Sequence, residues 1–150
     1  MIVHNWSIAC SRYIQDRGRG FLSLIDVRES IEINPEDTSF SLEVVSSWRA
    51  RPLQAQRFRF RVHVLRDSEL ILESGELNLS IGAGGRAFSA VTMNAESSTP
   101  GDYTIEVSYY AASRWKTGAR LPLFIRSRSD GPEATPKPPS PRNRSKKARK

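Results

Sequence analysis

The chain has one cysteine, two histidines and no long apolar run, and each shortage excludes a class of protein. Because Cys10 is alone, no disulfide can form within the chain and no cysteine cluster can bind a metal. The longest apolar runs are far shorter than the ~20 residues that a membrane helix needs. The N-terminal segment has neither a basic region nor a sustained apolar one, so it does not resemble a secretory signal. We therefore expect a cytoplasmic protein with no membrane partner.

The net charge of +7 is concentrated at the C-terminal end. Residues 131–150 carry a charge of +6 and the other 130 residues carry only +1. This end also holds five of the nine prolines and no aromatic or branched aliphatic residue, so it has nothing to bury that would offset the entropy of ordering. The sequence therefore predicts one domain over residues 1–128 and a disordered, proline-rich basic tail over residues 129–150.

Hydrophobic residues in the predicted domain recur with a period of two, which is typical of half-buried strands. We expect strands over 2–10, 21–27, 30–33, 39–48, 57–64, 76–81, 103–109 and 120–125. Turn signals separate them, and no stretch of ten residues has helical periodicity. This pattern is typical of an all-β sandwich or barrel, and the sequence PGDY at 100–103 favours a single antiparallel, immunoglobulin-like β-sandwich.

The segment RFRFRVHV at 57–64 raises the question of nucleic-acid binding, because arginines alternate with aromatic residues. A sheet that stacks bases needs its aromatic and basic residues on one exposed face. Alternation instead sends Phe58 and Phe60 to one face and the arginines to the other. We therefore expect a core strand with a solvated arginine stripe, which remains free to meet an acidic partner.

The residues that usually carry catalysis form no pattern that points to an active site. His4 and His63 lie on different predicted strands, without the spacing of metal ligands. Cys10 alternates with apolar residues and reads as a small buried hydrophobe. The glycine-rich segment at 82–86 precedes a strand-like run rather than a helix, so it does not predict a phosphate loop. The sequence thus predicts no catalytic, metal or cofactor site and no enzyme.

Two features are candidates for binding. Trp6 and Trp48 alternate with core residues, whereas Trp115 falls in a basic loop between the last two strands. There it is either an exposed interaction anchor or a plug over the end of the sandwich. The tail provides candidate residues for binding polyanions such as nucleic acid, without sequence specificity, and its other interpretation is a solubilising terminus. These candidates are Lys137, Arg142, Arg144, Lys146, Lys147, Arg149 and Lys150.

Three segments together resemble a bacterial family of small proteins known as domain of unknown function 6941. They are IACSRYIQDRGRGFLSLIDVRESIEI, FRFRVHVLRDSEL and the pair PGDYTIEVSYY and ARLPLFI, and the resemblance covers about residues 3–126. The resemblance implies an immunoglobulin-like β-sandwich in a bacterial cytosolic protein, and it supplies no functional residue. The basic tail departs from the compact pattern of the family.

These observations favour a non-catalytic, cytosolic β-sandwich that acts as a protein-interaction or accessory module. The alternative is a nucleic-acid-associated protein that its basic tail holds on the polymer. An enzyme with an unrecognised site is the third possibility, and clustering of a histidine with carboxylates in a pocket would favour it.

Overall fold

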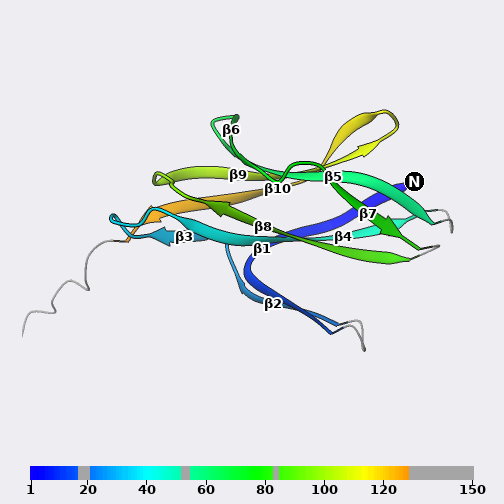
Figure 1. Ribbon diagram of the computed structural model, residues 1–150, viewed down its shortest axis with the longest axis horizontal. Helices are drawn as coiled ribbons and strands as arrows, with labels where there is room; N and C mark the ends of the chain where they lie inside the picture. The colour runs from blue at the N-terminus through cyan, green and yellow to red at the C-terminus, as the bar shows by residue number, and fades with distance from the viewer. Residues whose placement is uncertain (17–20, 52–54, 83–84, 129–150) are drawn as a thin grey trace, which may run out of the picture.

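The computed structural model describes residues 1–16, 21–51, 55–82 and 85–128, and every regular element in them is a strand (Figure 1). The strands are β1 (Ile2–Asp16), β2 (Phe21–Val27), β3 (Ser30–Ile33), β4 (Phe40–Ala50), β5 (Gln56–Arg66), β6 (Glu69–Glu73), β7 (Leu77–Ile81), β8 (Arg86–Ala95), β9 (Gly101–Ala111) and β10 (Arg114–Ser127). The tail predicted over 129–150 lies outside the described residues. No described helix is long and apolar enough to cross a membrane.

The strands form two stacked sheets, so the prediction of an all-β sandwich is confirmed. The smaller sheet has the order β2-β1-β4-β8. The larger sheet has the order β3-β10-β9-β5-β6, and β7 pairs with β5 along the same edge as β6. One pair departs from the antiparallel prediction: β3 runs parallel to β10. After β2 the chain crosses from the smaller sheet to the larger one. There β3 forms the edge of the sheet and pairs with β10 in the parallel direction.

The core lies between the two sheets and follows the predicted alternation in the middle strands. On β5 the four apolar side chains that the sequence places on one face, Phe58, Phe60, Val62 and Val64, are all buried. On β4 the indole of Trp48 is completely buried and packs against aromatic rings from the larger sheet. Its Nε1–H donates to Ser89 Oγ at 2.9 Å, so the only polar atom of this side chain has a partner.

A β-bulge in β1 changes the face on which one predicted core residue lies. The register against β4 shifts between His4 and Trp6, so one extra residue opposes the partner strand. Before the bulge Ile2 faces the core, and after it Ala9 does, whereas Trp6 points to the outer face and is 36% exposed. The prediction of Trp6 as a core residue is therefore wrong, because a one-residue insertion exchanges the two faces of a strand.

Two segments predicted as turns or loops are strands in the structure. The chain from 110 to 119 was expected to form a basic loop, but β9 extends to Ala111 and β10 begins at Arg114. Ala112 and Ser113 both have positive φ, which is the geometry of a two-residue hairpin turn. Trp115 is therefore the second residue of β10, not a loop residue. The short strand β6 was also missed, because most of its side chains are exposed and do not alternate in polarity.

The PGDY segment at 100–103 forms a corner that a tyrosine hydrogen bond closes. The hydroxyl of Tyr103 donates to the carbonyl oxygen of Thr99 at 2.8 Å, and the ring is buried at the start of β9. The guanidinium of Arg66 lies over the same ring at 5.5 Å from its centroid and donates to Thr99 Oγ1. Tyr103 thus fixes the connection between β8 and β9, as tyrosine corners do in immunoglobulin-like sandwiches.

We expect the substitution Tyr103→Phe to lower the free energy of unfolding by about 1–2 kcal/mol, because it leaves a carbonyl oxygen in the corner without its donor. Urea unfolding followed by tryptophan fluorescence measures this change. Tyr110→Phe is the matched control, since it removes a hydroxyl from a half-buried ring on the outer face of the same strand. Equal losses in the two variants would contradict the structural role of the corner.

Candidate functional site

The outer face of the larger sheet brings together residues from three strands that the sequence placed apart. Arg59 and Arg61 point outward from β5, Tyr110 from β9 and Trp115 from β10. The guanidinium carbon of Arg61 lies 4.2 Å from the centroid of the Trp115 ring, and that of Arg59 lies 4.3 Å from the Tyr110 ring. The two rings meet edge to face at 5.6 Å. We call this cluster of four side chains the arginine–aromatic face.

This arrangement differs from the prediction that the arginine side of residues 57–64 carries no aromatic rings. Phe58 and Phe60 do belong to the core, but the neighbouring strands supply two other aromatic rings to the arginine side of the sheet. The alternation within β5 cannot predict these two rings, because they come from β9 and β10. Which strands lie beside β5 is decided by the tertiary fold. Trp115 is half-buried on the face of the sheet, and neither of its two predicted settings, an exposed loop or a plug at the end of the sandwich, is observed.

Carboxylates surround the arginine–aromatic face and neutralise part of its charge. Glu76 accepts a hydrogen bond from Arg59 Nη1 at 2.8 Å. Glu106 on β9 accepts one from Arg120 Nε at 2.9 Å. Both pairs are partly or largely exposed, so each adds little to stability. Arg61 has no such partner among the described residues, and its Nε atom is buried without an acceptor.

His63 follows Arg61 on the same side of β5, and it is mostly buried, although the sequence predicts a solvated stripe on this side of the strand. Its Nε2 atom has no hydrogen-bond partner among the described residues, and the nearest carboxylate oxygen, on Glu73, is 3.9 Å away. Burial lowers the pKa of His63, and the charge of Arg61 lowers it further, against the opposing effects of Glu73 and Glu106. The imidazole is therefore held neutral beside the arginine.

A second surface lies on the outer face of the smaller sheet and continues onto a projecting hairpin. β1 pairs with β4 only up to Cys10, and beyond it pairs only with β2, so the β1–β2 hairpin leaves the sandwich as an arm (Figure 1). The register places a row of mostly apolar side chains on one face of the sheet and arm, with Arg12 on the same face opposite Ile25. We call this row the apolar strip, and it consists of Trp6, Ile8, Ile14, Ile25, Val27 and Phe88.

Much of the apolar strip is open to solvent. Ile14 is 48% exposed, Ile25 41% and Val27 59%, and Trp6 packs against Phe88 with ring centroids 5.8 Å apart. Cys10 lies within the same row but is fully buried, and burial is the main cause of the raised pKa of its thiol. The thiol is therefore a packed apolar group, as expected from the sequence, while the branched side chains around it provide an unpartnered contact surface.

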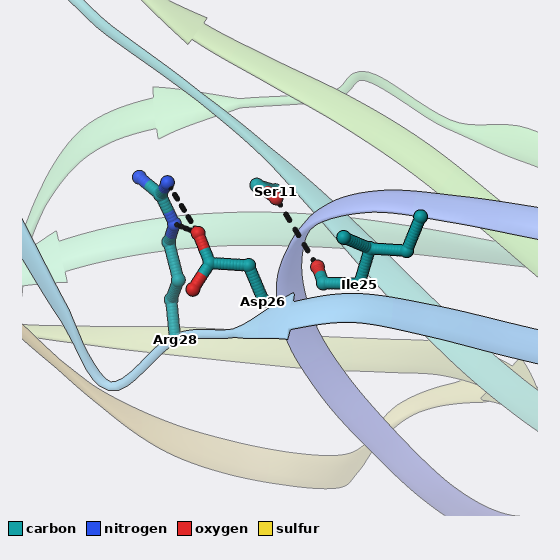
Figure 2. Close-up of polar contacts among 4 residues, drawn as sticks. All are labelled: Ser11, Ile25, Asp26 and Arg28. Carbon is teal, nitrogen blue, oxygen red and sulfur yellow. Dashed lines mark hydrogen bonds and ion pairs between the residues drawn. The ribbon is translucent and has the colours of Figure 1, made fainter.

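Polar contacts fix the base of the arm, as Figure 2 shows. Arg28 donates from Nε and Nη2 to the same carboxylate oxygen of Asp26, at 2.9 and 2.6 Å. Ser11 Oγ donates to the carbonyl oxygen of Ile25 at 3.1 Å, across the hairpin. Asp26, the residue before the last one of β2, has a φ of 54°, which is a left-handed conformation. These contacts hold the direction in which the arm leaves the sandwich.

The two histidines lie in different sheets and do not come together. His4 lies in the smaller sheet, half-buried, with its Nε2 2.7 Å from Ser7 Oγ, whereas His63 lies in the larger sheet. An open depression of about 490 Å³ beside the base of the arm is lined by charges of both signs, among them Glu29, Glu32 and Arg128. In the described ranges, no three His, Cys, Asp or Glu side chains converge as a metal site requires.

Comparisons with known proteins leave the chain without an assigned family. No family model matches it, and no curated protein matches it. Among solved structures, it is similar to the cupredoxin domain of AmoB from Nitrosocaldus yellowstonii, with 16% identity and a TM-score of 0.35. The match spans 65% of this chain and 64% of that domain. The resemblance to domain of unknown function 6941 stays a prediction, and the seven cations of the tail lie outside the described residues.

We expect the pKa of His63 to lie below about 6.5, the usual value for histidine, and to rise in the variant Arg61→Gln, because a neighbouring positive charge is removed. Glu73→Gln should lower it further. Proton NMR titration of the imidazole Cε1–H measures both shifts.

The same lowered pKa has a consequence for stability. Between about pH 6.5 and the folded-state pKa, the unfolded chain binds a proton at His63 that the folded chain does not. The free energy of unfolding should therefore fall as the pH drops below about 6.5, and fall less in His63→Gln. A pKa at or above 6.5 in the folded protein would contradict this account.

Proposed function

We propose that this chain is a non-catalytic, cytosolic protein-interaction module that binds its partner through the apolar strip and the β1–β2 arm. The observation that carries this proposal is a hairpin that leaves the sandwich with large apolar side chains exposed to solvent. Of the eight large hydrophobic residues that are exposed in the described ranges, four lie on the arm: Tyr13, Ile14, Ile25 and Val27. Ile14, Ile25 and Val27 share one face of the arm, and exposed apolar side chains gathered on one face mark interaction sites in soluble proteins.

The backbone of the arm supports the same proposal. β2 is an edge strand, since it pairs with β1 on one side and with no described strand on the other. Its sequence, FLSLIDV, contains no lysine or proline, the residues that commonly protect edge strands from pairing with another chain. An extended segment of a partner can add to this edge through main-chain hydrogen bonds, with alternate side chains packed on the apolar strip. We therefore propose strand addition as the mode of binding.

We expect Ile25→Asp to weaken partner binding, because it removes a large apolar side chain from the apolar strip and places a carboxylate opposite Arg12 in its stead. Leu70→Asp is the matched control, since Leu70 is similarly exposed, at 47% against 41%, but lies on β6 of the other sheet. Both sites are exposed, so neither substitution should change the free energy of unfolding by more than about 0.5 kcal/mol.

Site-specific photocross-linking in cells of the source organism measures this contact, with the photoreactive residue in place of Ile25 or of Leu70. A protein that cross-links in stoichiometric yield from position 25 alone supports the proposal, and sedimentation velocity of the purified chain shows whether that protein is a second copy. Cross-linking from position 70 alone, or equal yields from both positions, would contradict the placement of the interface on the arm.

The basic tail supports a second proposal, that the protein associates with nucleic acid. Seven cations within twenty residues attract polyanions through counterion release, and such binding weakens steeply as salt is raised. We expect the full chain to bind labelled single-stranded and duplex DNA in a salt-dependent manner. A full-length variant with these seven residues changed to glutamine should lose the binding. Fluorescence anisotropy across a salt titration measures it, and binding that persists in the variant would place the contact on the folded domain.

A further inference from the structure

The outward side chains of β5 form an evenly spaced row of positive charge. Arg57, Arg59 and Arg61 alternate along the strand, so their Cα atoms are about 6.7 Å apart at the usual rise of a strand. The rings of Tyr110 and Trp115 lie against the guanidinium groups of Arg59 and Arg61. Stacking of this kind holds a planar guanidinium in one orientation and leaves its edge free to donate hydrogen bonds.

One of the two stacked arginines of this face has no carboxylate partner. Arg59 is paired with Glu76, and on β10 Arg120 is paired with Glu106. Arg61 is stacked on Trp115, yet no carboxylate in the described part of the chain lies within ion-pair distance of it, and its buried Nε lacks an acceptor. A charged group without a counter-ion is costly, and an anion bound at the terminal Nη atoms, which are not among the buried unpaired atoms, would offset this charge. The neighbouring His63 carries no negative charge, and its Nε2 makes no hydrogen bond to Arg61.

We propose that the arginine–aromatic face is a second binding site, separate from the arm, that takes an extended acidic peptide segment of a partner protein. One carboxylate of the segment is seated on Arg61, where the planar guanidinium can donate two parallel hydrogen bonds. An extended peptide presents every second side chain on the same side, at the same repeat of about 6.7 Å as the arginine row. Acidic residues at positions i and i+4 therefore match Arg57 and Arg61, whereas Arg59 between them is already paired with Glu76.

Nucleic acid fits this face less well than an acidic peptide does. The rings of Tyr110 and Trp115 are faced by guanidinium groups and by each other, so they do not form the open platform on which bases stack. Three carboxylates, those of Glu73, Glu76 and Glu106, also lie among the arginines and the histidine. They repel a continuous phosphate backbone, whereas a peptide with spaced acidic residues can avoid them.

The test uses the full-length chain with the seven tail cations changed to glutamine, so that the probe cannot bind the tail. The probe is a six-residue peptide of alternating glutamate and threonine with blocked ends, and its glutamine analogue is the uncharged control. Two-dimensional NMR of the ¹⁵N-labelled protein follows the Trp115 indole and the Arg61 Nε–H during titration. We expect both signals to shift with the acidic peptide and neither to shift with the analogue.

Three substitutions make the test specific to Arg61. We expect Arg61→Gln to weaken peptide binding about tenfold or more, the loss expected for a hydrogen bond to a charged group. Arg61→Lys keeps the charge but not the planar donor pair, so it should weaken binding by an intermediate factor, and it serves as the second variant if Arg61→Gln does not fold. Arg86→Gln, an exposed arginine on β8 of the other sheet, is the matched control and should leave the affinity unchanged.

The remaining outcomes separate this proposal from the proposed function. Equal losses of peptide affinity in Arg61→Gln and Arg86→Gln would show that binding depends only on the overall positive charge, and this result would overturn the proposal. Shifts confined to the β1–β2 arm would overturn it too, whereas unchanged peptide affinity in Ile25→Asp would show that the two surfaces act independently. Binding of a six-nucleotide oligo(dT) that depends on Arg61, without binding of the acidic peptide, would reassign the face to nucleic acid.

Discussion

The packing of Trp48 between the two sheets is the contact on which the rest of the structure depends. Its indole comes from β4 of the smaller sheet and touches the rings of Phe58, Phe60 and Tyr109 from the larger one, with centroids 5.0, 5.6 and 5.7 Å away. His4 closes the same cluster edge to face at 4.9 Å. Rings at these distances and angles gain energy beyond the burial of their area. The cluster therefore fixes which faces of the two sheets meet.

The outer surfaces follow from this inner contact. Because Phe58 and Phe60 must point inward to reach Trp48, the residues between and beside them must point outward, and these are the arginines of β5. In the same way, Trp48 fixes the inward phase of β4, and the bulge in β1 then turns Trp6 to the outside. Each of these outer surfaces is thus the reverse side of a strand whose other face is packed in the core. The two surfaces differ in chemistry because the outward residues of β5 are arginines, whereas several outward residues of β1 are apolar.

Many strand positions could be predicted from the sequence, whereas the pairing of the strands and the contacts between them could not, and the reason is physical. The bounds of β2 and β3 match the alternating segments 21–27 and 30–33, since alternation is a local property of the chain. The bulge after His4, the parallel pairing of β3 with β10 and the meeting of Arg61 with Trp115 all depend on residues far apart in sequence. No pattern within β1 marks the bulge, so the position of Trp6 could not be deduced. For Trp115, a hairpin turn at Ala112 and Ser113 has none of the usual glycine or asparagine signals.

The arm differs from the sandwich in what stabilises it. Within the sandwich, each inner strand of a sheet has a neighbouring strand on both sides and packs against the other sheet. The part of β1 beyond Cys10 has only β2 beside it. A two-stranded hairpin without a third strand or a packed face is marginally stable in water. The contacts at Asp26, Arg28 and Ser11 hold its base, but they leave the apolar side chains beyond it uncovered. In the mode of binding that we propose, a strand added to β2 would supply both things that the arm lacks, a third row of main-chain hydrogen bonds and cover for Ile14, Ile25 and Val27. Partner binding would then also complete the packing of the arm.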